Sequence, residues 1–123
     1  MKKLLFVSLL FFSNFSMSSN WIKTGTIDGG TIYYDKQSII KSKNVITFWS
    51  KIDFNSVQSQ GKMTYNSWMT EIQIDCQTRK FVTIQSIPMF NGKPIDSNLQ
   101  PSQEWSSIIP DTPLSTNFVI LCK

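Results

Sequence analysis

A pair of cysteines in a chain that begins like an exported protein is the feature that most constrains its fold. Lys2-Lys3 supplies a positive start, Leu4–Phe12 a short apolar run, and Ser16-Met17-Ser18 the small residues of a cleavage site. These are the three parts of a secretory signal. The apolar run is far shorter than the roughly 20 residues that a membrane span needs. We therefore predict a signal peptide over residues 1–18, cleaved after Ser18, rather than the alternative of a buried N-terminal helix.

An even number of cysteines in an oxidising compartment predicts a disulfide. Cys76 and Cys122 are 46 positions apart, and closing a loop of that length stabilises a domain by roughly 4 kcal/mol in the chain-entropy model. A metal site is a poor alternative because the sequence has no histidine, and two thiols alone do not complete a tetrahedral zinc shell. We expect neither a metal nor another cofactor.

Removing residues 1–18 from the 123-residue chain leaves 105 residues, which suits one domain over residues 19–123. Without Lys2 and Lys3, 10 of the 12 basic residues remain against 8 acidic ones, a net charge of +2. This charge is too weak and too scattered to indicate nucleic-acid binding. Bacterial lipoproteins carry a cysteine directly after the signal, and none follows Ser18 here. We expect a soluble exported protein without a membrane anchor, in the periplasm, secreted or at the cell surface.

Alternation of apolar and polar residues predicts several strands. On Ser67–Cys76 one face carries Trp68, Ile72, Ile74 and Cys76, so that this cysteine points inward. The same reasoning, with turns at Asp28-Gly29-Gly30, Gln77–Lys80 and Asn91-Gly92, predicts further strands at Trp21–Ile27, Thr31–Asp35, Val45–Phe54 and Phe81–Ile87. Pro88 indicates a bulge or a sheet edge.

The remaining segments are predicted from polarity and capping residues. Gln58–Lys62 is polar and contains glycine, which predicts an exposed loop, and Ser102 could cap a short helical turn through Trp105. Thr112 before Pro113 is typical of a helix start. A helix there places Leu114, Phe118 and Leu121 on one side with Cys122. A final strand is the rival interpretation, because Phe118, Ile120 and Cys122 also alternate.

The composition argues against an enzyme. Without histidine, the serine and cysteine catalytic triads cannot form. Glu71 and Asp75 share one face of a predicted strand, but at strand rise they lie about 13 Å apart, too far for a glycosidase pair. We therefore predict no catalytic residues.

Lysines and tryptophans are the candidate binding residues. Lys36, Lys41, Lys43 and Lys51 surround the strand at Val45–Phe54, and such a cluster is either solvated surface or a contact for acidic polymers. Trp68 faces inward and is assigned to the core, whereas Trp49 is opposite the apolar face of its strand. The candidate ligand-binding residues are Lys41, Lys43, Lys51 and Trp49.

A series of short motifs extends along almost the whole mature chain. Trp21 is followed by Tyr33-Tyr34-Asp35, Ser38-Ile39, Val45 and Trp49, then by Glu71–Cys76, and finally by Trp105, Pro110 and a cysteine next to the end. The series resembles the bacterial surface-adhesin protein E family, in which a tyrosine–aspartate pair precedes a serine-containing turn and a tryptophan-bearing strand.

The resemblance implies an α+β fold with a single antiparallel sheet of about six strands. A C-terminal helix packs on the sheet and is tied to a strand by the disulfide Cys76–Cys122. It also implies a non-catalytic adhesin with a role in cell adhesion and virulence, whose partners are host extracellular-matrix proteins or plasminogen. The alternative is a soluble periplasmic structural or accessory protein with an envelope protein as partner, and a homodimer is left open.

Overall fold

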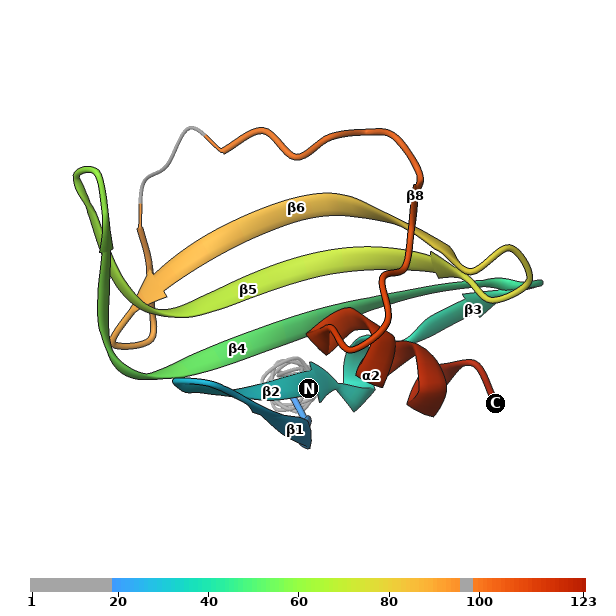
Figure 1. Ribbon diagram of the computed structural model, residues 1–123, viewed down its shortest axis with the longest axis horizontal. Helices are drawn as coiled ribbons and strands as arrows, with labels where there is room; N and C mark the ends of the chain where they lie inside the picture. Colours follow the sequence, from blue (N-terminus) through green and yellow to red (C-terminus); the bar gives the residue numbers. More distant parts are fainter. Residues whose placement is uncertain (1–18, 96–98) are drawn as a thin grey trace, which may run out of the picture.

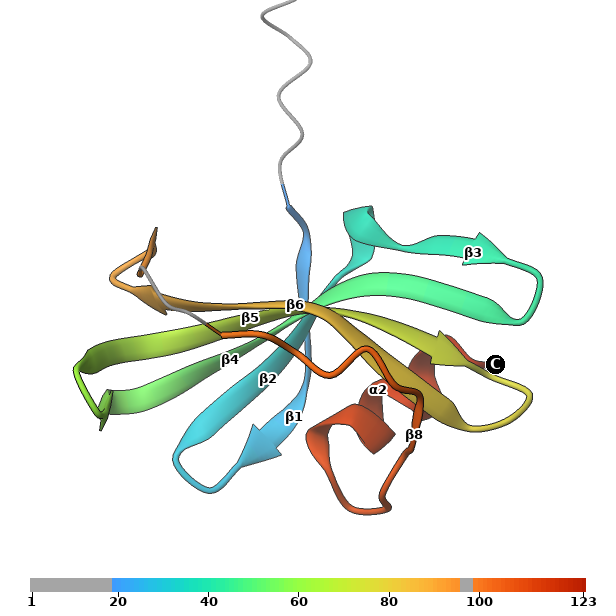
Figure 2. The ribbon, with the colours of Figure 1, turned by 90° about the horizontal axis from the view of Figure 1, so that it is seen from above.

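The computed structural model of this protein describes residues 19–95 and 99–123. The predicted signal peptide, residues 1–18, lies outside the described residues. Figure 1 shows a long twisted sheet with a short helix packed near one of its ends. Figure 2, seen from above, shows how far the strands rotate relative to one another, which is the usual twist of a sheet built from L-residues.

Eight strands, one 3₁₀ turn and one α-helix make up the described part of the chain. The three long strands are β4 (Val45–Gln60), β5 (Met63–Asp75) and β6 (Lys80–Phe90). The other elements are β1 (Trp21–Ile27), β2 (Gly30–Asp35), η2 (Lys36–Ser38), β3 (Ile40–Ser42), β7 (Lys93–Pro94), β8 (Ser106–Ser107) and α2 (Pro113–Leu121).

The sheet is antiparallel, with the strand order β1-β2-β4-β5-β6-β7. β3 pairs with β4, and β8 pairs with β6. Register brings the alternating apolar residues together, because Phe48 lies opposite Ile72 and Ile46 lies opposite Ile74. Phe48 and Ile74 are fully buried. The period-two pattern therefore predicted the sheet face that forms the core.

Helix α2 covers this core face. Leu121 belongs to the core cluster with Ile46 and Phe48, and Leu114 and Phe118 pack against it. Thr112 is the N-cap: its hydroxyl accepts from the Ser115 amide at 3.3 Å, and the Ser115 hydroxyl accepts from the Thr112 amide at 3.0 Å. This reciprocal pair satisfies two donors at the helix start. The prediction of a helix beginning at Thr112-Pro113 is confirmed, and the rival strand is not formed.

The described part of the sheet has eight strands, more than the predicted six or so. The additional strands have three residues in β3 and two each in β7 and β8, and segments this short leave no alternation to detect. The predicted strands are found. β4 and β6 continue past their predicted ends, and β5 begins four residues before its predicted start and ends at Asp75.

Two local predictions were wrong. Gln58–Lys62 is not a loop, because Gln58–Gln60 pairs with β5 and only Gly61-Lys62 forms the turn. Ser59 and Gln60 are exposed, so polar residues occupy consecutive strand positions there and show no apolar alternation. Ser102 does accept from the Glu104 amide at 3.3 Å, but no helical turn follows, because Ser106–Ser107 pairs with β6 instead.

Candidate functional site

Hydrogen bonds of two side chains, Asp35 and Ser38, order the connection from β2 to β4. Asp35 is 7% exposed, and its Oδ1 accepts from the Asn20 amide at 2.8 Å and the Gln37 amide at 3.0 Å. The Ser38 hydroxyl donates to the Asp35 carbonyl at 2.7 Å and accepts from the Trp49 amide at 2.9 Å. These bonds fasten η2 to the start of β1 and to β4.

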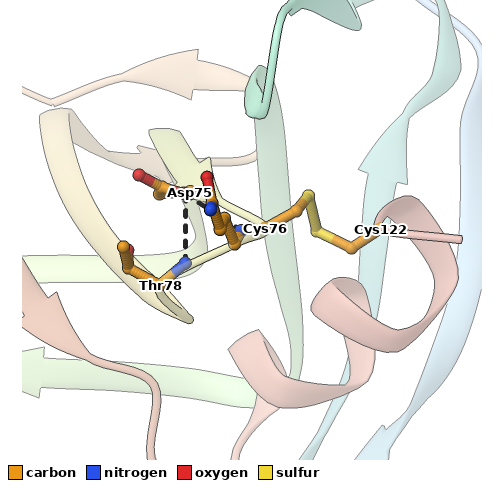
Figure 3. The surroundings of a disulfide bond; sticks show 5 residues. Asp75, Cys76, Thr78 and Cys122 are labelled. Carbon is orange, nitrogen blue, oxygen red and sulfur yellow. Dashed lines mark hydrogen bonds between the residues drawn. A yellow bond between two sulfur atoms is a disulfide. The ribbon is translucent and has the colours of Figure 1, made fainter.

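The predicted disulfide is present and joins β5 to α2. Cys76 directly follows β5, Cys122 is the C-cap of α2, and their Cα atoms are 5.6 Å apart. The turn beside the bond is ordered by Asp75, whose Oδ1 accepts from the amides of Gln77 at 2.9 Å and Thr78 at 3.2 Å. Figure 3 shows the turn and the disulfide side by side.

A basic hollow lies next to the disulfide. We use this name for a cavity of about 250 Å³ that contains three lysines. Lys41, Lys43 and Lys123 are all exposed. The remaining residues that line it are Asn44, Ile46, Cys76, Leu121 and Cys122. The described residues that line the hollow include no acidic side chain, so it presents positive charge to solvent.

Lys51 lies elsewhere, on the sheet face opposite α2. Its Nζ is 4.5 Å from the ring centre of Trp21, 5.0 Å from that of Tyr33, and 3.6 Å from a carboxylate oxygen of Asp53. The Lys51 side chain is 20% exposed. Lys51 lines a second cavity of about 450 Å³. Other walls of this cavity come from β5, which contributes Met69, and from the connection between β6 and β7. The ammonium group of Lys51 is thus already engaged by two aromatic rings and a carboxylate.

The four predicted ligand-binding residues therefore do not form one cluster. Lys41 pairs with Ile46 on the helix side of the sheet, and Lys51 is five residues further along β4, about 17 Å at strand rise. Trp49 is half-buried. It lies two residues before Lys51 on β4 and therefore shares with Lys51 the sheet face opposite α2. Nearness in sequence was misleading because β4 is long and its successive side chains face opposite sides. The structure groups Lys41 and Lys43 in the basic hollow and leaves Trp49 and Lys51 on the other face.

The two carboxylates considered for catalysis have structural partners. Glu71 accepts from the side-chain amide of Gln85 at 2.9 Å, and Asp75 orders the turn before β6. Trp68 shares the sheet face of Ile72 and is half-buried beside α2.

Asn117, a buried polar residue of α2 that is 1% exposed, was not predicted from the sequence. The available signal was its position one turn after Leu114 and four residues before Leu121, in the middle of the predicted apolar stripe.

The model of a known protein family, described as surface-adhesin protein E, matches residues 21–123. The chain belongs to the surface-adhesin protein E family. This match covers the motifs from Trp21 to the terminal cysteine, and the resemblance expected from the sequence is confirmed. A search of curated protein sequences finds no relative that matches.

Two solved structures share the fold of this family member. The structure of Haemophilus influenzae protein E has a TM-score of 0.62 at 16% identity, over 87% of this chain and 86% of that chain. Its selenomethionine form has a TM-score of 0.63 at 16% identity, over 87% and 88%. A helix with the length and apolar character of a membrane span is absent from the described residues 19–95 and 99–123.

Proposed function

We propose that the protein is an exported adhesin that binds host extracellular-matrix proteins or plasminogen without catalysing a reaction. The observation that carries this proposal is membership of the surface-adhesin protein E family over residues 21–123. The structural roles of Glu71 and Asp75 support a binding rather than a catalytic protein.

The basic hollow is the contact surface that the geometry favours. Lys41, Lys43 and Lys123 are exposed and are not balanced by acidic residues in its lining, among the residues that the structure describes. An acidic surface on a partner would find a complementary potential there. Lys51 is a weaker candidate because moving its ammonium group to a partner would break its contacts with Trp21 and Tyr33.

A binding screen joined to cell fractionation tests the proposed function. Residues 19–123, purified with the disulfide formed, are presented to immobilised matrix proteins and plasminogen at physiological salt. The proposal predicts saturable binding to at least one of them and recovery of the protein from the cell surface or the medium. Strictly periplasmic recovery with no binding would overturn it in favour of an accessory protein of the envelope.

A further inference from the structure

The cavity of about 450 Å³ beside Lys51 lies on the sheet face opposite α2. We call it the sheet cavity. Its floor consists of paired residues of neighbouring strands, and the members of such a pair point to the same face of an antiparallel sheet. The pairs are Lys51–Met69, Asp53–Ser67 and Ser67–Met89. Trp21, whose ring centre is 4.5 Å from Lys51 Nζ, adds a wall from β1.

Asp53 and Ser67 form the first of two fixed polar pairs in the lining. The Ser67 hydroxyl donates to Asp53 Oδ1 at 2.8 Å. Because a carboxylate only accepts, the single hydroxyl proton of Ser67 is used, and its oxygen keeps lone pairs. Asp53 Oδ2 lies 3.6 Å from Lys51 Nζ, and the Asp53 side chain is 43% exposed. This pair therefore presents hydrogen-bond acceptors.

Asn66 and Asn91 form the second pair, beside the turn between β6 and β7. The Asn91 backbone amide donates to Asn66 Oδ1 at 3.0 Å, and Asn66 Nδ2 donates to Asn91 Oδ1 at 2.9 Å. A backbone N–H can only donate, so these bonds fix the orientation of both side-chain amides. Asn91 is exposed, and its Nδ2 has no acceptor among the described residues. This pair therefore presents N–H donors.

The charged side chains of the sheet cavity balance each other. Lys51 and Asp53 are the charged side chains among the described residues that line it, and they form an ion pair. Trp21, Met69 and Met89 supply apolar surface. A matching ligand has groups that both donate and accept hydrogen bonds, as hydroxyls do, together with an apolar face and no net charge. Sugars combine these properties.

We propose that the sheet cavity binds a neutral saccharide, either a single sugar or the end of a glycan chain. Its hydroxyl groups accept from Asn91 Nδ2 and donate to Asp53 Oδ2, and its C–H face packs against Trp21. The cavity volume is within the range of small-molecule sites. The two polar pairs are ordered without the ligand, which lowers the entropic cost of binding. This site is separate from the basic hollow and does not depend on the proposed function.

Titration of the ¹⁵N-labelled exported protein tests the proposal, with the Trp21 indole and the Asn91 backbone amide as reporters. The probes are neutral di- and trisaccharides of hexoses and N-acetylhexosamines, each at millimolar concentration. At least one probe should shift both signals. Its affinity should not change with salt, because an uncharged ligand makes no ionic contact to screen.

A charged counterpart of the tightest probe, carrying one sialic acid, tests the neutrality of the ligand. Cleavage after Ser18 would place an α-ammonium group at Ser19, which also lines the cavity. The proposal predicts that the sialylated form binds no more tightly than the neutral one, because the hydroxyl and C–H contacts provide the affinity.

Variants locate the site. Asn91→Gly removes the donor and keeps the turn, because glycine accepts the φ of 50° found there; it should lose roughly threefold to tenfold in affinity. Trp21→Ala removes the apolar wall and should lose roughly tenfold or more. Trp105→Ala is the matched control, because Trp105 is 43% exposed and does not line the cavity. This control and Lys41→Glu/Lys43→Glu should bind the probe as the wild type does.

Five results would overturn the proposal. They are the absence of a shift with every neutral probe, tighter binding of the sialylated form, an affinity that falls as salt rises, unchanged binding by Asn91→Gly, and a loss with Trp105→Ala as large as that with Trp21→Ala. If Trp21→Ala fails to fold, Asn91→Gly and the salt series on the wild type still decide.

Discussion

Asp35 and Ser38 show what single residues contribute to the family motif. Each uses one oxygen to connect parts of the chain that are distant in sequence, because Asp35 reaches Asn20 and Ser38 reaches Trp49. Asp35 is also buried, so its carboxylate has to keep its donors. In the tyrosine–aspartate pair and the serine turn of the motif, Asp35 and Ser38 therefore have a structural role. They hold β1 and β4 on either side of β2.

Replacing Asp35 by alanine should lower the free energy of unfolding by about 1–3 kcal/mol, because the amides of Asn20 and Gln37 lose their acceptor. Asp35→Asn keeps an oxygen at the same place and should cost less. Urea denaturation of both variants measures the difference. Equal stability of the wild type and Asp35→Ala would contradict this role.

Helix α2 is the element that closes the core. Thr112 and Ser115 satisfy its first donors, Pro113 fits its first turn, and Leu121 reaches Ile46 on β4. The Arg79 guanidinium lies 5.0 Å from the ring centre of Phe118, so the turn between β5 and β6 also contacts the helix. Loss of either helix end would expose apolar surface of the sheet.

The N-cap of α2 can be tested separately from the core. Thr112→Ala should lower the free energy of unfolding by about 1 kcal/mol, because it removes the acceptor for the Ser115 amide. Thr112→Ser retains a hydroxyl and serves as the matched control. Thermal unfolding followed by circular dichroism should rank the alanine variant lowest, and the reverse order would show that the cap does not stabilise the helix.

The disulfide fixes the other end of α2 to β5. Replacing both Cys76 and Cys122 by serine should lower the free energy of unfolding by roughly 4 kcal/mol, a large share of the ~5–15 kcal/mol typical of a domain. Chemical denaturation measures the loss, and the reduced wild type should match the double variant. Alkylation of the native protein should find no free thiol, whereas two reactive thiols would refute the bond.

Elements with long, regular patterns were predictable, and those fixed by tertiary contacts were not. The alternation around Phe48 and Ile74 gave the core strands, and Thr112-Pro113 gave the helix start. β8 forms because the segment before α2 runs alongside β6 and pairs with it. The two residues Ser106–Ser107 carry no sequence pattern that indicates this pairing. The candidate site was predicted only in part. Lys51 was grouped with Lys41 and Lys43 because the three are close in sequence. In the structure Lys51 lies further along β4 and on the opposite sheet face.

At the scale of the whole molecule, the two ends of the sheet differ. One end carries the disulfide, the end of α2 and the lysines of the basic hollow. The other end is the exposed hairpin turn at Gly61-Lys62 (Figure 1). A partner with an acidic surface should therefore bind at the end that carries the disulfide. The lysines at the opposite end serve as a control.

Export is tested by the intact mass of the protein recovered from the producing cell. We predict a chain that starts at Ser19 with no diacylglycerol adduct and with a mass two hydrogens below that of the reduced form. A chain that retains Met1, or one that carries a lipid, would be incompatible with the predicted cleavage.

The salt dependence of partner binding is the sharpest test of docking at the basic hollow. For any matrix protein or plasminogen that binds, the dissociation constant is measured from low to high salt for the wild type, Lys41→Glu/Lys43→Glu and the control Lys62→Glu/Lys93→Glu, which changes the net charge equally. Exposed charges are screened beyond ~8 Å at physiological salt. Affinity should therefore fall as salt rises, and the variant at the basic hollow should lose roughly tenfold or more while the control keeps its affinity. Binding that survives both high salt and the charge reversal of Lys41 and Lys43 would exclude the basic hollow as the contact surface and point to the aromatic surface around Trp49.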